Sequence, residues 1–190
     1  MIEDRLSVIK ADLAARMIDR WVGQEKGKFV SIEPEHLMWL CIELEQARKQ
    51  SAIRLLGDPI LRRKAAPWTG DPIQIIRRLE TVMRSANGIG LAAPQIGESV
   101  RVAVIDLDGD ILSLVNPHIV WRSDEVATEQ EGCLSIPGYE VSVTRPTSIV
   151  VYTGSAEVRL NGIQSRAAQH EIDHLDGVLI LDRWMEQVRE

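Results

Sequence analysis

One short segment of the chain has side chains at a spacing that suits metal chemistry: His170-Glu171-Ile172-Asp173-His174. On a helix, residues four positions apart share one face, so His170 and His174 can both reach one metal ion. Glu171 follows the first histidine, and a carboxylate there can act on water beside the ion. The segment indicates metal-assisted hydrolysis, although a pattern with three fixed positions also arises by chance.

Two histidines do not complete a catalytic metal site, because such sites commonly use three protein ligands and keep one position for water. No histidine follows His174, and the later glutamates, Glu186 and Glu190, lie near the C-terminus. Cys133 is the remaining soft donor, and sulfur with two imidazoles suits iron(II), zinc, cobalt or nickel. The alternative for Cys133 is a small buried apolar residue, the usual fate of a free cysteine.

The residues around Cys133 favour the ligand interpretation. In the segment from Glu131 to Gly138, two glycines and a proline predict a tight turn or a strand end. The second cysteine, Cys41, falls on the apolar face of an expected helix and is interpreted as a core residue. Two cysteines cannot form a disulfide framework, which fits a reducing compartment.

A third segment combines small residues with one amide: Gly88-Ile89-Gly90-Leu91-Ala92-Ala93-Pro94-Gln95. It differs from a dinucleotide-binding loop because it follows an expected helix and lacks a third glycine. Small residues allow the backbone to approach another group closely. The side-chain amide of Gln95 can donate a hydrogen bond there.

The elements that must position these residues follow from the hydrophobic pattern. Gly57-Asp58-Pro59 and Gly70-Asp71-Pro72 each predict a turn in which Asp caps and Pro begins a helix. A helix with an apolar stripe follows the second turn and ends near Asn87-Gly88; the stripe is Ile73, Ile76, Leu79 and Met83. Strands are expected at 100–105, 111–115, 118–122, 141–143, 148–152 and 157–160. A helix at 164–175 stops near Gly177.

This order predicts an α+β fold with mainly antiparallel short strands around a central metal-binding helix. Residues 1–52 are expected to form a helical N-terminal extension, and 53–190 the catalytic domain. The extension has two apolar stripes, Leu6, Ile9, Leu13, Met17 and Trp21, then Leu37, Leu40, Cys41 and Leu44. Packing on the main domain is favoured over a partner-binding pair of helices.

The composition excludes some classes. The chain has 190 residues and a net charge of −6, which argues against general nucleic-acid binding. The N-terminus mixes acids and bases without an apolar core, so no secretory signal is expected. No apolar run is long enough for a bilayer span, and no membrane partner is expected.

Taken together, the three segments resemble the peptide deformylase family. Its glycine-rich motif, its Glu-Gly-Cys-Leu-Ser motif at 131–135 and its His-Glu-x-x-His helix are all present in order. Supporting resemblance comes from Asp58 to Arg62, Val115-Asn116-Pro117, Leu175-Asp176-Gly177 and Leu181-Asp182-Arg183. The resemblance runs from about Ile53 to Trp184. It implies a metal-dependent hydrolase that removes the N-terminal formyl group from formylmethionyl peptides of nascent proteins.

The resemblance implies a role for each motif residue. Cys133, His170 and His174 would hold the metal, and a metal-bound water would attack the formyl carbon with Glu171 as general base and acid. The Gln95 amide and the Leu134 backbone N–H would stabilise the oxyanion. Two further acids stay open: Asp173 is expected either to support the metal ligands indirectly or to pack the helix, and Glu131 either supports a ligand or lines the pocket mouth.

The family's peptide lies as an added strand, for which Ile89, Gly90 and Gly132 would supply the edge. Ile89, Ile163 and Ala167 are candidates for the methionine pocket, with core packing as the alternative for each. The sequence departs from the family in the extension and in a stretch, 146–165, that looks abbreviated. The second departure bears on specificity more than on chemistry.

The family implies one divalent ion, with Fe2+ as the native metal and Zn2+, Ni2+ or Co2+ as substitutes. It also implies a bacterial cytoplasm, with an organelle as the less favoured alternative, and the ribosome as a further candidate partner. A metallopeptidase is disfavoured because no downstream third ligand exists, and a non-catalytic peptide binder because it would not need Glu171 or Gln95. A deformylase specialised for one peptide stays open.

Overall fold

The computed structural model describes residues 53–188. The expectations for 1–52, including both apolar stripes and Cys41, lie outside the described residues, as do 189–190. The elements follow in the order η1 Pro59–Arg62, α3 Ile73–Ser85, β1 Gly90–Ala92, η2 Ala93–Ile96, β2 Val102–Leu107, β3 Asp110–Val115, β4 His118–Arg122, β5 Val126–Cys133, β6 Ile136–Pro146, β7 Ser148–Tyr152, β8 Glu157–Asn161, α4 Gly162–Leu175 and α5 Ile180–Val188.

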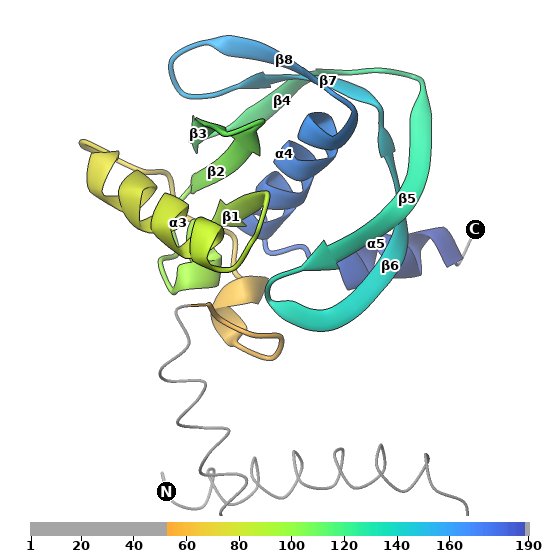
Figure 1. The fold of residues 1–190 in the computed structure, drawn as a ribbon, viewed down its shortest axis with the longest axis horizontal. Helices are drawn as coiled ribbons and strands as arrows, with labels where there is room; N and C mark the ends of the chain where they lie inside the picture. Colours follow the sequence, from red (N-terminus) through yellow and green to blue (C-terminus); the bar gives the residue numbers. More distant parts are fainter. Residues whose placement is uncertain (1–52, 189–190) are drawn as a thin grey trace, which may run out of the picture. The chain divides into compact units, whose positions relative to one another are not determined.

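The strands form three antiparallel sheets in the orders β1-β2-β3, β4-β7-β8 and β5-β6. Helix α4 runs through the middle of these sheets, with α3 outside the first sheet and α5 beside the hairpin β5-β6 (Figure 1). The predicted α+β fold with mainly antiparallel strands and a central helix is confirmed. Within 53–188, no helix is both long and apolar enough to span a membrane.

The first four residues of β2 are apolar because helices cover both faces of the strand there. Ala103 and Ile105 pack in the cluster that contains α4, while Val102 and Val104 pack in the cluster that contains α3. All four are fully buried. Successive side chains of a strand point to opposite faces, so a strand between two layers must be apolar at every position.

Helix α4 reaches the centre of the domain through small residues. Ala167 and Ala168 allow the strands to approach its first half, and Ile172 and Leu175 fill the space along the second. The predicted helix begins two positions earlier than expected, at Gly162. It ends as predicted before Gly177, whose φ of 77° lies in the left-handed region that glycine favours.

The turn predictions agree with the structure in one case and differ slightly in the other. Asp58 accepts a hydrogen bond from the N–H of Ile60 at 3.0 Å, and Pro59 begins η1. Asp71 accepts from the N–H of Ile73 at 3.0 Å, but Pro72 is the residue before α3 rather than its first.

Several elements were missed and two local predictions were inaccurate. Strands β1 and β5 and helix α5 were not predicted, and β6 is longer than 141–143. Strand β5 is mostly polar and forms because each residue from Val126 to Gly132 pairs with β6. On α3 the buried residues are Ile75, Leu79 and Met83, whereas Ile73 is 42% exposed.

Candidate active site

A pocket of about 700 Å³ opens between β1, the β5-β6 hairpin and α4. One wall includes Gly90 of β1 and Ile89 just before that strand. The others include Gly132 and Cys133 at the end of β5 and His170 on α4. These segments are far apart in the sequence, and the sheets bring them to one side of the helix. The pocket therefore joins all three segments that carry the chemical motifs.

Three potential metal ligands meet at the inner end of the pocket. The donor atoms of Cys133, His170 and His174 all lie within 4.8 Å of one another. Sγ of Cys133 is 3.3 Å from Nε2 of His174, and the two imidazole rings have centroids 5.0 Å apart. Protein sulfur and nitrogen ligands bind zinc-like ions at about 2.0–2.3 Å, so donors at this spacing can surround one ion. The residues present fit a divalent metal.

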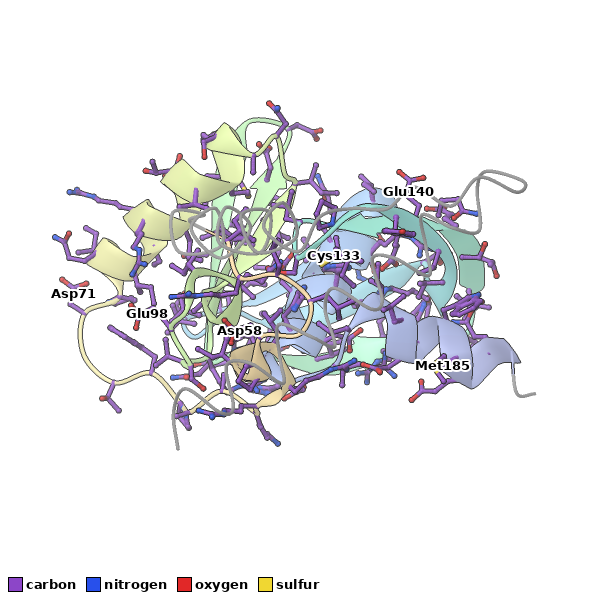
Figure 2. The ribbon with its side chains drawn as sticks, turned by 90° about the horizontal axis from the view of Figure 1, so that it is seen from below. Asp58, Asp71, Glu98, Cys133, Glu140 and Met185 are labelled. Carbon is purple, nitrogen blue, oxygen red and sulfur yellow. The ribbon has the colours of Figure 1, made fainter. Side chains whose placement is uncertain are left out.

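Figure 2 shows Cys133 in the middle of the domain, where β5 ends beside α4. This position agrees with the predicted strand end. Cys133 is 9% exposed and His174 is 1% exposed, so the donors are shielded from bulk water. Burial, followed by the charges of His170 and Arg145, keeps the pKa of His174 well below its usual value of 6.5. A neutral imidazole is the form that binds a metal.

Glu131 supports the ring of His170 through a contact with its Nδ1 atom. Its Oε2 lies 3.2 Å from Nδ1 of His170. The same carboxylate accepts hydrogen bonds from Nε and Nη2 of Arg145 at 2.6 and 2.9 Å and from Nη1 of Arg166 at 2.6 Å. Burial would raise the pKa of Glu131, but these hydrogen bonds from His170 and Arg145 and their charges lower it to about 2. The group is an ionised, fully hydrogen-bonded carboxylate in the interior.

Glu171 faces the pocket without a partner. Its side chain is 4% exposed, and its Oε2 has no hydrogen-bond partner within 53–188. Burial raises the pKa of this carboxyl to about 7. Buried polar atoms are nearly always satisfied, so an orphaned carboxylate oxygen in a pocket indicates a group that bonds water or substrate.

Gly90 explains why the glycine-rich segment approaches so closely. A Cβ atom at Gly90 would lie 3.0 Å from both Cγ and Cδ of Glu171. Such a contact is too short for carbon atoms, so only glycine leaves the Glu171 side chain its present position. The prediction that this segment packs closely against another group is confirmed.

The amide of Gln95 is held in one orientation. Its Oε1 accepts the backbone N–H of Ala92 at 2.8 Å, and its Nε2 donates to Oγ of Ser135 at 3.2 Å. Nε2 also lies 3.9 Å from Sγ of Cys133. The amide nitrogen therefore points toward the ligand cluster. Leu134 follows Cys133 in the loop between β5 and β6 and lines the same pocket.

The candidate pocket residues differ in exposure. Ile89 is 52% and Ile163 is 58% exposed, and both line the pocket, so core packing does not account for either. Ala167 is buried, lining the pocket and belonging to the core cluster. Gly132 lies exposed at the pocket wall. All the proposed site residues line the pocket except His174, whose Nε2 lies 3.3 Å from Sγ of Cys133.

Two arginines and one serine were missed by sequence reasoning. Arg145 joins Glu131 to Asp173, which lies 2.8 Å away on α4, and Ser135 holds Gln95. Arg166 lies four residues before His170, so its place on the ligand face of the helix was readable from the spacing. The position of Arg145 on a strand offered no such signal.

Two further acids, Asp173 and Asp176, each contact an arginine. Asp173 accepts hydrogen bonds from Arg145 and from Nε of Arg183, the latter at 3.1 Å. Because Arg145 also bonds Glu131, these contacts fit the alternative of indirect support for a ligand. Asp176 is 40% exposed and pairs with Arg101 at 2.6 Å. Arg101, which directly precedes β2, also donates a hydrogen bond to the carbonyl of Leu175. These two contacts hold the C-terminal end of α4 against the start of β2.

Fold and site together define a metal-dependent hydrolase whose His-Glu-x-x-His helix lies at the centre of an α+β domain. The sequence profile of the polypeptide deformylase family matches residues 50–190. The chain belongs to the peptide deformylase family. It is a hydrolase that removes the formyl group from the N-terminus of formylmethionyl peptides of nascent proteins, and its family is metal-dependent.

Individual relatives with similar sequences or structures are also peptide deformylases. The peptide deformylase of Natranaerobius thermophilus is 46% identical over 147 residues, covering 73% of this chain and 94% of the relative. That of Dictyoglomus thermophilum is 43% identical over 143 residues, covering 71% and 93%. The crystal structure of the Thermotoga maritima peptide deformylase has a TM-score of 0.65 and 41% identity, over 69% of this chain and 95% of that one.

Proposed function

We propose that Cys133, His170 and His174 hold one divalent ion and that Glu171 is the general base and acid of deformylation. The observation that carries the assignment is the buried Oε2 of Glu171, which has no hydrogen-bond partner among residues 53–188, beside the three clustered donor atoms. A carboxylate with a pKa near neutrality can both accept and return a proton at physiological pH.

A divalent ion held by these donors supplies Lewis acidity and lowers the pKa of water toward neutrality. Glu171 accepts a proton from water as the water oxygen bonds to the formyl carbon. Glu171 then delivers that proton to the amide nitrogen as the carbon–nitrogen bond breaks. Formate and a peptide with a free amine are the products, and Glu171 returns to its starting state.

The Gln95 amide and the Leu134 backbone N–H are the proposed donors to the oxygen of the tetrahedral intermediate. The bond from the Ala92 N–H and the bond to Ser135 fix the Gln95 amide before substrate arrives. Donors that need no rearrangement are the most effective, and losing one typically costs about 100- to 1000-fold in rate.

The peptide is proposed to bind as an added strand against Ile89, Gly90 and Gly132, with the methionine side chain between Ile89, Ile163 and Ala167. Main-chain pairing accepts many sequences, as an enzyme acting on nascent chains requires. The exposure of Ile89 and Ile163 at the pocket supports this assignment. The Acinetobacter baumannii relative, 30% identical, has been solved bound to Met-Ala-Ser, and the Synechococcus elongatus relative, 40% identical, in complex with actinonin.

Iron(II) is the proposed native metal, and zinc, nickel or cobalt are substitutes that the same ligands accept. Sulfur ligation then makes the enzyme sensitive to oxygen, because a thiolate and a ferrous ion both oxidise. We place the enzyme in a bacterial cytoplasm, with the ribosome as a partner that presents nascent chains. We divide the chain into an N-terminal extension at 1–52 and a catalytic domain at 53–190.

The test is formate release from formyl-Met-Ala-Ser by anaerobically purified, iron-loaded protein beside Glu171→Gln. We expect turnover by the wild type and a loss of at least about 100-fold in the variant. Metal analysis of both proteins separates loss of the proton carrier from loss of the ion. Turnover that survives in a metal-loaded Glu171→Gln protein would remove Glu171 from the mechanism.

A further inference from the structure

One charged side chain at the pocket has no assigned task. Of the charged residues that line the pocket, Glu131 and Arg166 bond each other, and His170 and Glu171 belong to the reaction centre. Glu140 is exposed, and within 53–188 its side chain has no hydrogen bond or ion pair. Its charge is therefore available to a molecule that enters the pocket.

Glu140 lies beside the edge proposed for the peptide. It pairs with Gly132 across the β5-β6 ladder. A Cβ atom at Gly132 would lie 3.7 Å from Cγ and 4.0 Å from Oε1 of Glu140. The Glu140 side chain thus lies next to the exposed Gly132 at the pocket wall. Figure 2 shows Glu140 on the outer part of this hairpin, away from the more central Cys133.

The formylated end of the substrate offers no cation to this carboxylate, because a formyl amide is neutral. A complementary charge must come from a side chain farther along the peptide. An extended chain advances about 3.3 Å per residue, so the second and third residues pass the region next to Gly132. A lysine or arginine there has a flexible stem long enough to reach Glu140.

We infer that Glu140 is a specificity-determining residue that favours peptides with lysine or arginine at the second or third position. The inference rests on the proposed function, since it uses Gly132 as part of the peptide edge. The effect is modest, because exposed charge pairs are weak, and corresponds to about a two- to fivefold gain in kcat/KM over alanine. It decreases with added salt, which screens exposed charges.

The experiment compares kcat/KM for formyl-Met-Lys-Ser, formyl-Met-Ala-Lys, formyl-Met-Glu-Ser and formyl-Met-Ala-Ser. The proteins are the wild type, Glu140→Gln, Glu140→Lys and the control Glu157→Gln, each at low and high salt. Glu157 is an exposed carboxylate on β8 and does not line the pocket.

We expect the wild type to prefer lysine at one of the two positions. Glu140→Gln should remove this preference, and Glu140→Lys should reverse it in favour of glutamate. The control Glu157→Gln should keep the wild-type preference. An unchanged ratio of lysine to glutamate peptides in Glu140→Gln would overturn the inference while leaving deformylation intact. If even formyl-Met-Ala-Ser were not hydrolysed by the wild type, the proposed function and this inference would both fail.

Discussion

The Nδ1 atom of His170 lies 3.2 Å from Oε2 of Glu131, and this contact determines which ring nitrogen of His170 faces the ligand cluster. A histidine ligand commonly bonds a carboxylate through its other nitrogen, which fixes the ring and raises its basicity. Here the carboxylate is itself held by Arg145 and Arg166. The geometry of the site therefore depends on a buried ionic network as well as on the three donors.

Replacing Glu131 by glutamine tests this network. The variant removes the buried carboxylate that both arginines share, leaving Arg145 with Asp173 and Arg166 with the exposed Glu129. Breaking a buried ion pair typically costs about 3–5 kcal/mol of stability. Metal affinity should fall by about 10- to 100-fold, as for other groups that support metal ligands. Urea denaturation and competition with a chelator measure the two effects.

Glu129→Gln is the matched control. Its carboxylate bonds Arg166 at 3.0 Å but is 57% exposed, so we expect a loss of stability below about 1 kcal/mol. Equal losses in the two variants would contradict the role of burial assigned to Glu131.

Gly90→Ala should inactivate the enzyme without unfolding it. The added Cβ would lie 3.0 Å from Cδ of Glu171 and displace the carboxylate that we assign as general base. Because such a group contributes about 100- to 10,000-fold, kcat should fall by at least about 100-fold. Steady-state kinetics with metal analysis checks this prediction.

Gly132→Ala is the comparison, because its Cβ would meet Glu140 only at 3.7 Å, an ordinary contact. It should change KM for the peptide more than kcat. A Gly90→Ala enzyme with normal kcat would show that Glu171 has room to move.

Ser135→Ala should lower kcat through Gln95. Ser135 is fully buried and its hydroxyl accepts the Gln95 amide at 3.2 Å, so its removal frees the proposed oxyanion donor to turn. We expect a fall in kcat on the order of tenfold, smaller than the loss of a donor itself, with little change in KM. Ser85→Ala, at an exposed position of α3, is the control. A change confined to KM would contradict this role.

Metal removal should lower thermal stability. A ligand at about 100 times its Kd stabilises the folded state by about 2.7 kcal/mol. For a domain of this size, that corresponds to a Tm shift of about 5–10 °C. Calorimetry before and after chelation, and after return of the metal, measures the shift.

The His174→Ala protein should lose this response, whereas His118→Ala, on the outer strand β4, should keep it. If chelation left the Tm of the wild type unchanged, this would argue against a metal held by Cys133, His170 and His174.

Local spacing explains what was predictable. The pair His170 and His174 and the placement of Glu171 follow from helical periodicity, which involves only neighbours along the chain. The close approach of Gly90 and the strand end at Cys133 follow from residue types with few conformational options. These features were enough to predict the candidate ligands, and the hydrophobic periodicity and order of elements were enough to predict the α+β fold.

Other features depend on pairs of residues far apart in the sequence. The eight-residue strand β5 has few apolar residues and forms through its ladder with β6. Arg145 reaches Glu131 and Asp173 only because a strand and a helix meet in the folded domain. For Ile163 the sequence left a pocket position and core packing open, and only the fold shows it 58% exposed at the pocket.

The sequence by itself determined the chemistry that the chain carries, because helical spacing and the residue types of its motifs are local properties. Only the tertiary structure decided which charges support that chemistry and which side chain is left open to a substrate. Those outcomes depend on burial and on contacts between distant segments, neither of which a local pattern contains.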